Sequence, residues 1–184
     1  MSDKKEKIKL LVKYTIQGRW DLMEPILQQF PELANTYLEY TNRGDTWKGF
    51  GLLHYACFST GPDSGVVLEH LISDYNADVN MVTMNDNGFN STPLLFASAN
   101  GKYNQVKTLL LLGANKKIRN KRGKCAGYQN YCCSWSGARI ENKQKILHLL
   151  DNPPPKYVPH TNINYHFNKL ELCTDEPDEP VADD

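Results

Sequence analysis

Cysteine and histidine are the residues of this 184-residue chain that could carry nucleophilic or metal chemistry. Cys125, Cys132, Cys133 and His148 are zinc-ligand types, but their spacing lacks the paired Cys-x-x-Cys of structural zinc sites. A thiol nucleophile such as Cys57 would need a neighbouring base, and the sequence places none beside it. We therefore expect no catalytic residue, no metal and no cofactor.

Composition and charge narrow the function classes further. The chain has no glycine-rich phosphate loop and no paired carboxylates in a regular context, so an enzyme is not expected. Its 21 basic and 21 acidic side chains cancel, which gives no global attraction to nucleic acid or membrane. No run approaches the roughly 18–20 apolar residues that cross a bilayer, and the N-terminus lacks an apolar signal core. We expect a cytoplasmic and/or nuclear protein with reduced cysteines and no membrane partner.

The elements that position these side chains follow a repeated pattern, seen best over residues 91–115. Thr92 is predicted to cap a helix, and Pro93 suits its first position, where no N–H is needed. This helix should end near Gly101. The apolar face of a second helix is formed by Tyr103, Val106, Leu109 and Leu110. Gly113 then provides a left-handed helix stop.

The same order of features occurs upstream and, more weakly, on both flanks. Residues 51–56 open a helix, residues 67–72 lie on the next, and residues 76–80 close the unit. Residues 5–35 and 123–151 form the two weaker units. Because one helix pair cannot bury its own apolar face, three or more stacked units are expected, with atypical units at the ends.

The first weak unit contains two predicted helices, separated near Gly18. Pro25 is expected to limit how early the second of them begins, since proline interrupts the hydrogen bonds of a helix interior. In the last unit, only the second half has helical spacing. Helix formation is expected to stop at residues 151–155, where three prolines follow one another.

Short sequences in the two central units resemble the ankyrin repeat, a unit of about 33 residues with a Thr-Pro-Leu-His start and a Gly-Ala end. The matching residues are Leu53-His54-Tyr55-Ala56, Thr92-Pro93-Leu94, Ala77-Asp78-Val79-Asn80 and Gly113-Ala114. Leu95 stands where histidine is usual, and Gly51-Leu52 stands where Thr-Pro is usual. The resemblance is clear over residues 49–120 and weaker over 5–48 and 121–151.

This resemblance implies an all-α fold: an ankyrin-repeat solenoid of about four helix pairs over residues 1–151. Residues 152–184 are then a proline-rich and acidic tail, disordered or loosely packed. The implied function is a protein–protein interaction adaptor or inhibitor that holds its partner on a concave face and is a monomer when free. His54 is interpreted as structural, hydrogen-bonding a neighbouring loop as histidine does in ankyrin repeats.

Ankyrin partners usually lie on the loop tips and on the first helix of each pair, which gives a set of candidate residues. The partner-binding candidates are Trp47, Lys48, Phe50, Phe58, Ser59, Phe89, Asn100, Lys121, Arg122, Lys124 and Trp135. Aromatic residues there could anchor a partner. Trp47 and Phe50 have an alternative interpretation, packing beneath their own loop.

Asn80 is a candidate for modification by hydroxylation. It follows Asp78-Val79, with Ile72 six residues before the aspartate, which resembles the asparagine-hydroxylation pattern of ankyrin repeats. The alternative is an asparagine that holds a turn.

Residues 116–124 contain six cations in nine positions. This loop could meet an acidic protein or nucleic-acid phosphates; alternatively it is a solvated loop or contacts the chain's own acidic tail. A nucleic-acid or ribonucleoprotein-associated factor is therefore the alternative function. A nucleic-acid partner is less expected than a protein, because no aromatic residues are interleaved with the cations.

The tail contains a short sequence that resembles the PPxY ligand of WW domains. Pro154, Pro155 and Tyr157 are the candidate residues. A preformed polyproline helix loses little entropy on binding, and the tyrosine would fill an apolar groove. The alternative is a proline stop after the last helix.

Overall fold

The computed structural model describes residues 2–42, 45–59, 61, 64–84, 90–126 and 137–156. In chain order its elements are α1 (Ser2–Gln17), α2 (Trp20–Gln29), the 3-10 helix η1 (Pro31–Asn35), β1 (Leu38–Asn42), β2 (Asp45–Phe50), α3 (Leu52–Ala56), α4 (Ser64–Ser73), α5 (Pro93–Ala99), α6 (Tyr103–Leu111) and α7 (Gly137–Asp151).

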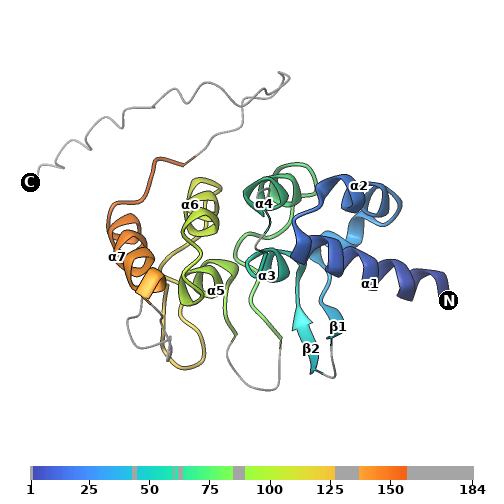
Figure 1. Cartoon of the computed structure of the whole chain (residues 1–184), viewed down its shortest axis with the longest axis horizontal. Coiled ribbons are helices and arrows are strands. Elements are labelled where there is room, and N and C mark those ends of the chain that lie inside the picture. Colours follow the sequence, from blue (N-terminus) through green and yellow to red (C-terminus); the bar gives the residue numbers. More distant parts are fainter. Residues whose placement is uncertain are drawn as a thin grey trace, which may run out of the picture.

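Helix pairs lie side by side along the molecule. The pairs are α1 with α2, α3 with α4, and α5 with α6, while α7 packs on α6 (Figure 1). Within this arrangement α1 contacts α3, α3 contacts α5, and α4 contacts α6, so two rows of helices run in parallel. The hairpin and the described parts of the connections after α4 and α6, within residues 74–84 and 112–126, project on one side of these rows (Figure 1).

The prediction of an all-α ankyrin-repeat solenoid is wrong, because β1 and β2 form an antiparallel hairpin and the fold is mixed α and β. Leu38 pairs with Phe50 and Tyr40 with Trp47, and a register shift lies between Leu38 and Tyr40. Alternating aromatic and polar residues favour strands over this segment. The strands are only five and six residues long and their register is irregular, so the alternation is too short to give a clear strand prediction.

Local signals set the ends of α5 and α6 as predicted. The Thr92 side chain accepts a hydrogen bond from the Leu95 N–H, and Pro93 occupies the first turn. Gly101 and Gly113 have φ values of +68° and +89°, which side chains other than glycine rarely adopt. The prediction for Pro25 is wrong: α2 begins at Trp20, and this exposed proline lies inside the helix.

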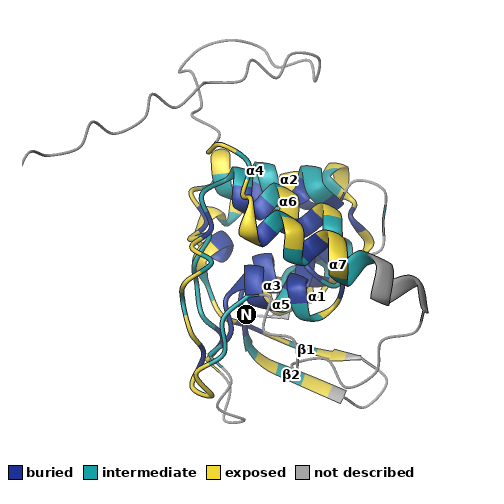
Figure 2. Cartoon of the chain, turned by 90° about the vertical axis from the view of Figure 1, so that its left-hand side faces the viewer, coloured by how far each residue is buried: buried dark blue, intermediate teal, exposed yellow. Residues whose placement is uncertain are grey.

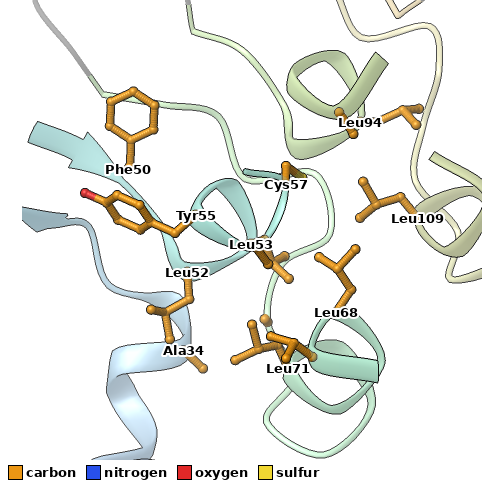
Figure 3. Packing of buried hydrophobic residues seen from close by; sticks show 14 of the residues in the cluster. Ala34, Phe50, Leu52, Leu53, Tyr55, Cys57, Leu68, Leu71, Leu94 and Leu109 are labelled. Atoms are coloured by element: carbon orange, nitrogen blue, oxygen red, sulfur yellow. The ribbon is translucent and has the colours of Figure 1, made fainter. Parts of the chain in front are cut away.

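A single cluster of buried apolar side chains joins the helices from Leu11 in α1 to Leu150 in α7. Near its centre, Leu53, Leu68, Leu94 and Leu109 converge from four helices (Figure 3). Figure 2 shows that α3 and α5, between the outer helices and the hairpin, carry mostly buried residues. Each pair therefore covers apolar surface of the next, which supplies most of the driving force for folding.

Candidate functional site

A row of aromatic side chains crosses from β2 of the hairpin, through the turn that follows α3, to α5. Trp47 lies 4.7 Å from Phe58 between ring centroids, and Phe58 lies 4.9 Å from Phe96. Both pairs are edge-to-face, the arrangement that the ring quadrupoles favour. All three side chains are half-buried. We call Trp47, Phe58 and Phe96 the aromatic row; each ring keeps part of its surface available to a partner.

The hairpin is held on α3 by a buried tyrosine. The Tyr55 hydroxyl lies 3.3 Å from the Trp47 carbonyl and 3.4 Å from the Leu38 carbonyl, to which it can donate. Burial raises the pKa of Tyr55, and the charge of Glu39 adds to this effect, so the hydroxyl keeps its proton. Figure 3 shows the Tyr55 ring beside Phe50, next to the strands of the hairpin. The position of Trp47 is therefore fixed by its pairing with Tyr40 across the hairpin and by the hydrogen bond from Tyr55 of α3.

Two of the predicted partner-binding residues are interior. Phe50 is 8% exposed and packs against Phe96 and His54, which matches the alternative of packing beneath the loop. Ser59 is fully buried, and its carbonyl accepts hydrogen bonds from Lys102 Nζ and Gln105 Nε2, both at 3.2 Å. Neither side chain presents a surface in this structure, because each fills a junction between neighbouring elements.

Other predicted residues lie at the surface near the aromatic row. Lys48 is exposed and pairs across the hairpin with Glu39 at 3.5 Å. Asn100 is exposed, and its Nδ2 donates to the Phe96 carbonyl at 2.8 Å. Phe89 and Trp135 lie outside the described residues.

Sequence reasoning missed Phe96 and Met84. Phe96 aligns with Tyr55 of the preceding unit, which is a core residue. The repeat pattern therefore gave no indication that the Phe96 side chain would be partly exposed. Met84 is 65% exposed, and its N–H donates to the Gly49 carbonyl of β2 at 2.8 Å. Met84 could have been found from the sequence, because a methionine in a segment that connects two helices is a candidate for an exposed apolar contact.

The basic loop has a closed tip. The Asn120 N–H donates to the Lys124 carbonyl at 2.8 Å, and Asn120 Oδ1 accepts from the N–H groups of Arg122 and Lys124 at 3.0 and 2.9 Å. Gly123 has a φ of +70°, which allows the turn. Lys121 and Arg122 are exposed and Lys124 is half-buried. Asn120 Nδ2 is buried, and the described residues supply no acceptor for it.

Asparagine side chains connect successive units. Asn35 Oδ1 accepts from the Asp78 N–H at 2.7 Å, and Asn80 Oδ1 accepts from the Asn115 N–H at 2.8 Å. The Asn80 N–H in turn donates to Asp78 Oδ1 at 2.9 Å, so Asn80 does hold a turn. Asn80 is half-buried, and its hydroxylation stays a prediction.

His54 in α3 and Cys57 directly after it are buried and contribute to packing. His54 is fully buried; its Nδ1 accepts from the Gly51 N–H at 3.2 Å and its Nε2–H donates to the Ser91 carbonyl at 2.9 Å. Burial lowers its pKa to about 4, so the ring is neutral at pH 7. The buried Cys57 thiol donates to the Pro93 carbonyl at 3.3 Å, and burial raises its pKa. The structural interpretation of His54 is confirmed.

Among the described residues, no group of three or more His, Cys, Asp or Glu side chains could hold a metal ion. No helix of the described part is long and apolar enough to span a bilayer. Of the PPxY residues, Pro154 is half-buried and Pro155 is exposed, and Tyr157 lies outside the described residues.

No family model matches the sequence, and no curated protein matches it either.

Proposed function

We propose that this protein is a non-catalytic protein-binding module, an adaptor or inhibitor whose partner docks on the aromatic row and the adjoining loop side. The observation that carries the proposal is the aromatic row itself: three half-buried rings in contact, from β2, the turn after α3, and α5. Folded proteins bury most large aromatic rings, and interface hot spots are enriched in tryptophan and tyrosine. Rings held by strand, helix and neighbouring rings lose little entropy on binding.

Two further features support a protein as the ligand. Met84 adds exposed, adaptable apolar surface beside β2. The exposed Asn100 donates to the Phe96 carbonyl and supplies a polar group beside the aromatic row, as expected for an interface rim. The resemblance of residues 49–120 to ankyrin repeats points to the same class of function. Recruitment of a WW-domain protein through Pro154, Pro155 and Tyr157 remains part of this proposal.

The alternative, a nucleic-acid or ribonucleoprotein-associated factor, depends on the exposed cations Lys121 and Arg122. Single strands are usually bound by cations together with stacking aromatic rings. Residues 116–124 include no aromatic residue, and the aromatic row belongs to other elements. The observations therefore favour a protein partner.

The test uses paired tryptophan variants of the full chain. Partners are captured from the native cell and identified, and affinities are then measured with the purified partner. Trp47→Ala and Phe96→Ala should each weaken binding at least about tenfold, the effect of losing one hot-spot ring. Trp20→Ala is the matched control, because Trp20 is also half-buried but stacks on His70 at the α2–α4 side of the molecule.

A loss of affinity must be distinguished from a loss of folding. Thermal unfolding of each variant first shows that it is folded. Loss of affinity in Trp20→Ala together with normal affinity in Trp47→Ala and Phe96→Ala would place the partner elsewhere and refute the proposal.

A further inference from the structure

The charges of this neutral chain are separated along its length. Residues 1–99 contain 8 lysines and arginines against 12 acids, and residues 100–156 contain 12 against 2. Residues 157–184 contain 1 against 7. The last helices and loops of the described molecule are therefore strongly basic, and the chain that follows them is acidic.

The basic charge is concentrated on a loop whose shape is fixed in advance. Asn120 closes the tip through its backbone and through Oδ1, as described above. Arg119 Nη1 donates to the Gly123 carbonyl at 2.7 Å, which braces the other side of the turn. Because the backbone is already ordered, little entropy is lost when an anionic segment contacts the exposed cations Lys117, Lys121 and Arg122.

We propose that this loop is the docking site of the chain's own residues 174–184. That segment contains six acids and no basic residue, against six cations in residues 116–124. The proposed contact joins residues 174–184 to residues 116–124 and uses no residue of the aromatic row. Because the acidic segment belongs to the same chain, it can occupy the loop at every protein concentration.

The connecting chain is long enough for this contact. Lys116, at the start of the loop, donates to the carbonyl of Leu150 near the end of α7. Leu150 lies only six residues before Lys156, the last described residue. The chain between Lys156 and Asp175 can span up to about 60 Å at roughly 3.3–3.6 Å per residue. The base of the loop is therefore close to the point from which the acidic segment departs.

The covalent link to the loop favours the chain's own acidic segment over a separate acidic molecule. Exposed ion pairs are individually weak and are screened by salt. A tethered segment has an effective concentration on the order of millimolar, so it outcompetes free acidic peptides at lower concentration. The contact should weaken as ionic strength rises.

The test uses full-length chains and a synthetic peptide of residues 174–184. In one variant all six acids of that segment become amides (Asp→Asn, Glu→Gln). Binding of the labelled peptide is followed by fluorescence anisotropy, and amide shifts of residues 116–124 locate it by NMR. We expect the peptide to bind the amide variant at least about tenfold more tightly than the wild-type chain, whose own segment occupies the loop.

Charge reversals locate the site. Adding Lys121→Glu and Arg122→Glu to the amide variant should abolish peptide binding, while Lys5→Glu and Lys9→Glu on α1 should leave it unchanged. Equal peptide affinity for wild-type and amide chains, no binding to either, or equal losses in both reversal pairs would overturn the proposal. So would tight binding of single-stranded RNA that the peptide cannot displace. Partner affinity at Trp47 is a separate measurement, so the two proposals fail independently.

Discussion

At the scale of single residues, the side chains with the most reactive chemistry contribute to structure. His54 connects the start of α3 to Ser91, 37 residues later, through a ring with no access to solvent. A buried charge without a partner is costly, so the neutral ring is strongly favoured in the folded state. This has a measurable consequence for stability.

Acidification should destabilise the protein through His54. The unfolded chain binds a proton at this residue near pH 6.5, whereas the folded chain binds it near pH 4. Between these values the unfolded state holds more protons, so the free energy of unfolding rises with pH. The contribution is complete above pH 6.5 and is lost as pH falls to 4. It amounts to about 3 kcal/mol, at 1.36 kcal/mol per pKa unit.

Urea unfolding at a series of pH values between 4 and 7 measures this effect. His54→Gln removes the titrating group, so the difference in stability between wild type and variant should shrink by that amount as pH falls. Parallel curves for the two proteins would show that the histidine is not the cause.

At the scale of elements, close backbone contacts fix how the helix pairs approach each other. Gly61, between α3 and α4, lies against the turn that follows α1. A Cβ atom at Gly61 would lie 2.4 Å from the Gln17 carbonyl oxygen and 3.5 Å from the Gly18 Cα. Both are backbone atoms, which cannot move aside as a side-chain end can. The two turns therefore set the spacing of the first and second helix pairs.

Gly61→Ala should lower the free energy of unfolding by about 1–3 kcal/mol, the usual cost of overpacking. Gly65→Ala in α4 is the matched control. Its Cβ would meet only the Thr108 hydroxyl, at 3.3 Å, and alanine favours a helix over glycine by about 0.5–1 kcal/mol. Denaturant midpoints compare the two variants. If Gly61→Ala were as stable as Gly65→Ala, the contact with Gln17 would not determine the spacing.

At the scale of the whole molecule, the continuous core makes the helix pairs interdependent. The buried cluster extends without a break from α1 to α7, and Leu109 is fully buried in it. Arrays of similar units can lose cooperativity when one interface is weakened. Here the α3–α4 pair packs against α1 on one side and against α5 and α6 on the other, so we expect the molecule to unfold as one unit.

Leu109→Ala should cost about 2–5 kcal/mol, the range for a buried leucine. Leu22→Ala is the control, because Leu22 is 37% exposed and its change should stay within about 0.5 kcal/mol. Circular dichroism and intrinsic fluorescence should report the same shifted midpoint for Leu109→Ala. Separate transitions by the two probes would contradict a single cooperative unit.

The helices with local capping and stop signals could be predicted from the amino-acid sequence alone. Thr92, Pro93 and Gly113 act on the backbone within a few residues, so capping, first-turn and stop positions were readable without the fold. Helical spacing likewise placed Val106 and Leu109 on the buried face of α6.

The β hairpin and the composition of the candidate surface depend on contacts between segments that are distant in the sequence. A two-stranded hairpin is marginal alone, and this one depends on packing and on hydrogen bonds from Tyr55. Tyr55 is fully buried while Phe96 is half-buried, although these two aromatic residues occupy matching positions of successive units. Exposure depends on which distant elements cover a side chain, and local spacing carries no information about those contacts.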